Sequence, residues 1–197
     1  MGGLFVLLVA VGVASSAPPV TSARPSPAAW ADGSLLFVEN VGQFDPRARF
    51  QAHGGGATLW LTEDGLWVIL IPALTSSPFV AVGPGGGSEG VALRLSFPGA
   101  NPHPRLEPFA PQDVVVNYYL GSDPAGWHTH VPVWGGVRYV DLYPGVDLEI
   151  GGREGRWTWR LVCRANCQFV LQNTQLRVEG AEGVRVEGNA LRIETAV

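Results

Sequence analysis

Apolar and polar residues alternate with a period of two along most of this chain, and this alternation constrains the fold more than any other feature. The clearest case is "VALRLSF", residues 91–97, in which every second residue is apolar and Arg94 points to the opposite face. Beyond Leu35 no segment keeps the 3.6-residue period of an amphipathic helix. The sequence therefore predicts an all-β chain, either an antiparallel β-sandwich or two packed sheets.

Turns rich in glycine, proline and asparagine divide the alternating segments and set the expected strands. "ATLWLT" and "LWVILI" flank "EDG" and predict a hairpin. The proline-rich segment 98–111 is expected to cross between strands without forming one. The other expected strands are 34–40, 48–54, 91–97, 114–120, 135–142, 145–150, 156–163 and 168–173, followed by three short strands within 176–196.

The N-terminus has the pattern of an export signal. Residues 4–14 form an apolar run that small residues follow, and the run is shorter than the roughly 20 residues that a membrane-spanning helix needs. We expect residues 1–23 to be a signal peptide, 24–34 a linker rich in proline, alanine and serine, and 35–197 one all-β domain. The expected location is outside the cell or on its surface, with no membrane span after cleavage.

The two cysteines, Cys163 and Cys167, enclose only three residues. In an oxidising compartment they would close a small disulfide ring. Two thiolates at a metal would be the alternative, but the sequence has no second cysteine pair to complete such a site. We therefore favour the disulfide.

The charge pattern excludes several functions. The formal net charge is −4 and no basic cluster is present, so binding of nucleic acid through its phosphates is not expected. All 13 basic residues are arginine, which removes mechanisms that depend on a lysine amine. No sequence pattern for a cofactor is found, and we expect none.

Three weak candidate sites remain. His128 and His130 are two residues apart and could offer two zinc ligands from one strand face, but His53 and His103 have no matching spacing. Asp147 and Glu149 would share a strand face near Asp141, an arrangement that fits carboxylate catalysis, calcium binding or merely a turn with solvent-facing groups. A metal-dependent hydrolase is the least favoured reading.

The third candidate is a sugar-binding surface. The chain has seven tryptophans, and exposed aromatic side chains can stack on sugar rings. Trp157 and Trp159 lie two residues apart and are the predicted ligand-binding pair, while Trp60 and Trp67 lie in one hairpin. Tryptophans in β proteins also fill cores, so a carbohydrate-binding module stands as the second choice.

Several short motifs together resemble one family. They are Asn40-Val41-Gly42-Gln43, Asn117-Tyr118-Tyr119-Leu120-Gly121, Trp127, Val131-Pro132 and Tyr143-Pro144-Gly145-Val146-Asp147-Leu148. With their surroundings, residues 35–197 resemble the N-terminal domain of unknown function that precedes SBBP (seven-bladed beta-propeller) repeats in large secreted bacterial proteins.

This resemblance implies an exported all-β module and offers no catalytic residues to carry over. Such domains usually continue into further strands and the repeats, so it also implies that the chain stops inside or near the end of the domain. Asn40 and Gln43 are expected to act as amides that fix a turn. The expected function is a non-enzymatic structural or interaction accessory. Its expected partner is the propeller repeats or another extracellular protein, with a glycan as the alternative.

Overall fold

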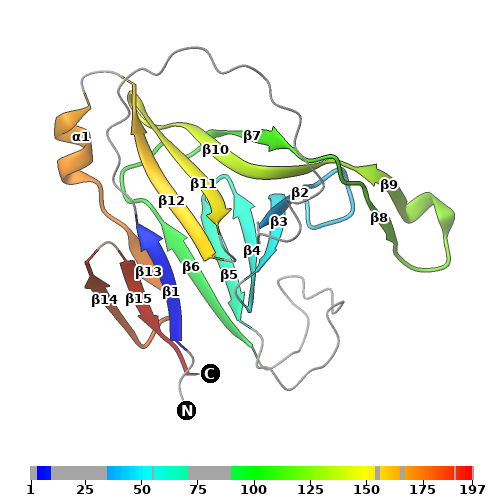
Figure 1. Ribbon diagram of the computed structural model, residues 1–197, viewed down its shortest axis with the longest axis horizontal. Helices are drawn as coiled ribbons and strands as arrows, with labels where there is room; N and C mark the ends of the chain where they lie inside the picture. The colour runs from blue at the N-terminus through cyan, green and yellow to red at the C-terminus, as the bar shows by residue number, and fades with distance from the viewer. Residues whose placement is uncertain are drawn as a thin grey trace.

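The computed structural model describes residues 4–9, 35–54, 56–70, 90–153, 156–164, 167–188 and 190–196 (Figure 1). It confirms the all-β class: the described part of the chain is mostly strands, with one short α-helix. Apart from residues 4–9, the expected export signal and the linker lie outside the described residues. None of the described helices is long and apolar enough to cross a membrane.

Most of the described strands join one curled sheet, in which neighbouring strands run antiparallel except for β1 and β12. Its strands follow the order β13-β6-β5-β4-β3-β2-β10-β11-β12-β1-β15-β14, and β7 also pairs with β10. Strands β8 and β9 form a separate pair. The strand bounds are β1 Leu4–Val9, β2 Leu36–Glu39, β3 Ala48–Gly54, β4 Ala57–Thr62, β5 Gly65–Leu70, β6 Val91–Ser96, β7 Arg105–Pro111, β8 Val116–Tyr119, β9 Trp127–Val131, β10 Val133–Tyr143, β11 Val146–Arg153, β12 Arg156–Cys163, β13 Arg177–Glu179, β14 Gly183–Glu187 and β15 Ala190–Glu194.

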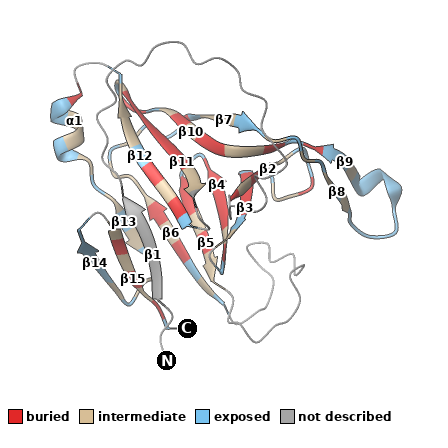
Figure 2. Cartoon of the chain, in the orientation of Figure 1, coloured by how far each residue is buried: buried red, intermediate tan, exposed pale blue. Residues whose placement is uncertain are grey.

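The sheet curls so that the apolar face of β4–β6 packs against the apolar face of β10–β12 (Figure 2). Leu59 and Leu66 on one side line a small apolar cavity together with Ile150 on the other. The Phe37 ring contacts the Trp157 ring edge-on, with centroids 5.9 Å apart. One core therefore forms between two parts of one sheet, because alternation gives each strand a single apolar face.

Tyr139 ties the two parts of the sheet together at a polar point inside the core. Its side chain is 2 % exposed, and its hydroxyl donates to the backbone oxygen of Thr62 at 2.9 Å. The backbone oxygen of Gly65 lies 3.3 Å from the same hydroxyl. Burial raises the pKa of Tyr139 well above its usual value, so this hydroxyl stays protonated and remains a donor.

The predicted hairpin of β4 and β5 is confirmed, with the turn at Glu63 and Asp64. Gly65 has a φ of +148°, and a Cβ there would meet the backbone oxygen of Leu95 at 2.5 Å. Only glycine fits this position. The three short strands expected within 176–196 are also present, as β13, β14 and β15.

Two secondary-structure predictions were wrong. Residues 168–173, expected as a strand, form the helix α1, Gln168–Asn173. The backbone N–H of Leu171 donates to the Cys167 oxygen, and the Thr174 hydroxyl donates to the Val170 oxygen, so local bonds replace a strand partner. The proline-rich crossing contains β7, which among the described strands pairs with β10 alone. At such an edge Pro108 needs no backbone N–H.

The strand β1 lies within the predicted signal peptide. It pairs antiparallel with β15 from Leu4↔Glu194 to Leu8↔Ala190 and parallel with β12 at Leu8↔Thr158 and Val9↔Trp159. The segment that carries the apolar run of an export signal is therefore also a strand between β12 and β15 in the full chain. Cleavage after residue 23 stays a prediction.

Replacing Tyr139 by phenylalanine should lower the free energy of unfolding by about 1–3 kcal/mol, because the backbone oxygens of Thr62 and Gly65 lose their buried donor. Tyr119→Phe is the matched control, since the Tyr119 side chain is 61 % exposed, and it should change stability by less than about 0.5 kcal/mol. Urea unfolding followed by circular dichroism measures both. Equal effects of the two substitutions would contradict this role of Tyr139.

Candidate functional site

The Asn40 side chain organises the loop between β2 and β3. Its amide nitrogen donates to the backbone oxygens of Asp45 and Ala48, at 3.0 and 2.6 Å. Its amide oxygen accepts from the backbone N–H groups of Gly42 and Phe44, at 3.0 and 3.2 Å. One side chain thus satisfies four backbone groups, as expected for a turn-forming amide.

Gln43 adds to the same loop, since its side chain accepts from the Val41 N–H at 2.8 Å and donates to the Glu39 oxygen at 2.6 Å. Gly42 has a φ of +117°, and a Cβ there would lie 3.0 Å from the His128 ring. The loop of residues 40–47, which begins with the first motif of the resemblance, is therefore fixed by its own side chains and packs against β9, and we call it the rigid loop.

Strands β8 and β9 form an arm that extends from one side of the molecule (Figure 1). We call residues 114–131 the arm. Its base packs on a second, smaller apolar cluster with Val131, Val133 and Val38 at its centre. Phe44 of the rigid loop contacts the Tyr118 ring edge-on, with centroids 5.2 Å apart.

The second motif shapes the outer part of the arm. The Asn117 side chain accepts from the backbone N–H of His130 at 2.9 Å, which braces a residue with a φ of +59°. The Trp127 indole N–H donates to the Gly121 oxygen at 3.2 Å. Asp123 accepts from the Ala125 N–H and caps the short 3-10 helix Pro124–Gly126.

The arm exposes large apolar side chains to solvent. The rings of Tyr119 and Trp127 contact each other edge-on at 5.4 Å and are 61 % and 41 % exposed. Val115 is 57 % exposed and Leu120 is 46 % exposed. Neighbouring exposed apolar groups of this size on a projecting hairpin are typical of a contact surface.

The predicted histidine pair is not part of a larger ligand set. His128 lies beside Gly42, while His130 is exposed and its positive φ interrupts the strand alternation on which the shared face depended. Among the described residues, no three histidine, cysteine, aspartate or glutamate side chains lie close enough to hold a metal ion. The structure thus gives the proposed zinc ligands no third partner in the part of the chain that it describes.

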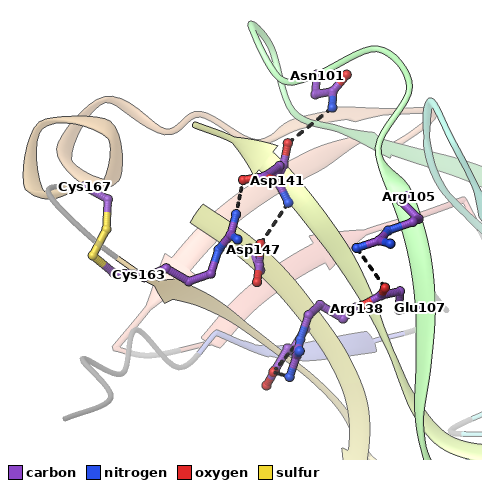
Figure 3. A network of polar contacts seen from close by, with 10 residues as sticks. Asn101, Arg105, Glu107, Arg138, Asp141, Asp147, Cys163 and Cys167 are labelled. Atoms are coloured by element: carbon purple, nitrogen blue, oxygen red, sulfur yellow. Dashed lines mark hydrogen bonds and ion pairs between the residues drawn. A yellow bond between two sulfur atoms is a disulfide. The ribbon is translucent and has the colours of Figure 1, made fainter. Parts of the chain in front are cut away.

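The predicted carboxylates are bound by arginines on the outer face of β10–β12 (Figure 3). Glu149, whose side chain is 7 % exposed, accepts from Arg138 and from Arg160, in each case at 2.6 Å. In the strand register, Glu149 of β11 is paired with Arg138 of β10 on one side and with Arg160 of β12 on the other. Glu149 therefore links three adjacent strands.

Asp147 is placed where the strand β10 bends. Its carboxylate accepts from the backbone N–H of Asp141, which has a φ of +51°, at 2.8 Å. Arg164 lies 3.3 Å from Asp147 and also pairs with the Asp141 side chain. Burial raises the pKa of Asp147, and the nearby Arg138 charge opposes this shift. These contacts favour the structural reading of the predicted acidic group.

The turn before β11 completes this arrangement. Pro144 and Gly145 form it, Gly145 has a φ of +73°, and the Gly145 oxygen accepts from the Arg164 N–H at 2.9 Å. Cys163 and Cys167 form the expected disulfide (Figure 3), and Arg164 follows Cys163 in the chain, within the ring that the disulfide closes. The disulfide ring therefore includes Arg164, the residue that pairs with Asp141 and Asp147.

Trp157 and Trp159 lie in the core and not on the surface. They are 3 % and 7 % exposed, the Trp157 N–H donates to the Gly54 oxygen at 3.2 Å, and the Trp159 ring packs on Phe97. Neither indole leaves a face open to a sugar ring, which contradicts the predicted ligand-binding role. Burial follows from the curl, because both residues point to the inner face of β12.

The other tryptophan pair borders a hollow on the opposite face of the sheet. Trp60 and Trp67 are register partners in β4 and β5. The hollow has a volume of about 140 Å³, and polar groups from the rigid loop and the β4–β5 turn line it together with the two indoles. Sequence reasoning noted this hairpin but missed the hollow, because the loop that closes one side lies more than ten residues away in the chain.

Glu149→Gln should lower the free energy of unfolding by about 1–3 kcal/mol, because two charge-assisted contacts are lost at a buried position. Glu107→Gln is the control on β7, since its side chain is 41 % exposed and pairs with Arg105 at 2.9 Å. It should cost less than about 0.5 kcal/mol. Chemical unfolding of both variants measures these changes. If both variants lose the same free energy of unfolding, the buried ion pairs of Glu149 contribute no more than the exposed pair of Glu107.

The double variant Cys163→Ser, Cys167→Ser should lose about 2 kcal/mol of stability, the loop-closure entropy of a five-residue ring. Dithiothreitol should lower the melting temperature of the unaltered protein and leave that of the variant unchanged. A melting temperature of the unaltered protein that does not respond to the reductant would refute the contribution of the ring.

A family model that covers residues 37–197 matches this chain, and it describes a domain of unknown function (DUF7948). It spans the curled sheet from β2 onward, the arm and the disulfide ring. No match was found among curated proteins or among solved structures. The chain belongs to the family of the domain of unknown function DUF7948.

Proposed function

We propose that this domain is exported and works without catalysis, as a structural and interaction module of a larger secreted or cell-surface protein. The arm is its contact surface. The observation that carries the proposal is the group of exposed apolar side chains on the arm, led by Tyr119 and Trp127. Large aromatic residues of this kind dominate the binding energy at protein interfaces.

The way in which the arm is held supports this role. Asn117, Asp123 and Trp127 each make a side-chain hydrogen bond to the backbone of the arm, and Phe44 packs at its base. These bonds fix the hairpin while its apolar groups stay in solvent. A surface organised before binding loses less conformational entropy when a partner covers it.

The proposed partner is a β-propeller of SBBP repeats. The motifs on which the resemblance to repeat-associated domains rests include Asn117-Tyr118-Tyr119-Leu120-Gly121 and Trp127, which form the arm. Export is supported by the apolar N-terminal run and by the disulfide, which is typical of proteins outside the reducing cytosol.

A recombinant propeller of SBBP repeats, immobilised for biolayer interferometry, tests this proposal. The full chain should bind it, and the double variant Tyr119→Ser, Trp127→Ser should bind at least tenfold more weakly, because the central apolar contacts are lost. Phe169→Ser is the matched control, since Phe169 is 75 % exposed on α1, and it should bind as the unaltered chain does.

Circular dichroism checks that all three proteins are folded. The proposal fails if the unaltered chain does not bind the propeller, or if the arm variant and the Phe169 variant bind equally well.

A further inference from the structure

The hollow beside Trp60 and Trp67 has the chemistry of a small binding site. We define it by six side chains from the rigid loop, the β4–β5 hairpin and its turn: Asp45, Arg47, Trp60, Thr62, Asp64 and Trp67. Its volume of about 140 Å³ has room for several waters or for a single ring of a small molecule. It is separate from the exposed groups of the arm, so its ligand does not depend on the partner of the arm.

The two carboxylates that line the hollow already have ion-pair partners. Asp45 accepts from the guanidinium of Arg47 through both oxygens, at 3.0 and 2.9 Å, and this holds its pKa at about 2. Asp64 accepts from the Thr62 hydroxyl at 2.6 Å and from Arg94 at 2.7 Å. Each carboxylate therefore has an arginine as ion-pair partner, although Arg94 also pairs with Glu179 at 3.3 Å.

Hydrogen-bonding capacity remains after this pairing. A carboxylate has about four acceptor positions and a guanidinium five donors, and the contacts described use only part of them.

The remaining lining is apolar and comprises Ala48, Ile69 and the two indoles. Trp60 and Trp67 lie directly opposite each other on neighbouring strands, and their side chains share the sheet face away from the core. Phe44 holds Trp60 edge-on at 5.1 Å, while Arg94 lies over the Trp67 ring at 5.7 Å. The half-buried Trp67 indole offers apolar surface to C–H groups, and the carboxylates and Arg47 offer hydrogen bonds to hydroxyls.

We propose that this hollow binds one uncharged sugar ring, either as a free monosaccharide or as a unit of a polysaccharide. An uncharged ring with hydroxyl groups on its rim and C–H groups on its face matches the paired carboxylates, the spare donors and acceptors, and the partly exposed Trp67 indole. The size of the hollow restricts the site to a single ring.

Saturation-transfer NMR on the full chain tests the proposal with glucose, galactose, mannose and N-acetylglucosamine. Dextran is the polysaccharide probe, and tetramethylammonium and inorganic phosphate are the charged probes. At least one monosaccharide should receive saturation, and neither charged probe should bind. Dextran that binds more tightly than glucose would identify a polysaccharide as the source of the ring.

Trp67→Ala should reduce the affinity for that sugar at least tenfold, and Asp45→Asn should reduce it by a similar factor. Trp127→Ala, which removes a half-exposed tryptophan from the arm, should leave it within twofold. Circular dichroism checks folding, and if Trp67→Ala does not fold, Asp45→Asn decides. Absence of saturation transfer to all five carbohydrates, equal affinity of the folded hollow variants and the unaltered chain, or binding of a charged probe alone would overturn the proposal.

Discussion

The packing of β4–β6 against β10–β12 is the constraint on which the rest of the molecule depends. Each of these strands has one apolar face, and the curl of the sheet brings the two sets of faces together around Phe37, Tyr139 and Trp157. The same curl decides which groups remain outside. It buries the tryptophans of β12. It leaves Glu149 with its two arginines, the hollow and the arm on the outer side of the sheet.

The loop that Asn40 fixes connects these outer features. Phe44 from this loop contacts Trp60 beside the hollow and Tyr118 at the base of the arm. The same loop supplies Asp45 and Arg47 to the hollow. A short motif that reads in the sequence as a simple turn therefore positions residues at two separate surfaces.

The strand positions could be predicted from the sequence because period-two alternation is a local signal, and it located β2 to β6, β8 and β10 to β15. It failed at residues 168–173, where side-chain hydrogen bonds to the backbone stabilise α1, and at β7, where prolines concealed an edge strand. The burial of Trp157 and Trp159 depends on the direction in which the sheet curls, which is not a local property.

The candidate sites were less predictable for the same reason. Residue spacing suggested a role for the histidines and carboxylates, but the partners that define their chemistry come from distant strands: Arg138 and Arg160 for Glu149, and Arg164 for Asp147. The disulfide needed only local spacing and is present. The exposed groups of the arm were named among the motifs, yet nothing in the sequence showed that they would project from the body.

The central claim is that the arm is an ordered hairpin whose apolar groups have no cover in the isolated domain. Hydrogen–deuterium exchange of the full chain, with and without the SBBP propeller, tests it most directly. The amides of β4, β5, β10 and β11 should exchange slowly in both samples. The amides that pair β8 with β9 should also be protected when the chain is alone, and they should exchange more slowly still when the propeller is added. Arm amides that exchange as fast as an unstructured chain when the domain is alone, or that the propeller leaves unchanged, would contradict the account.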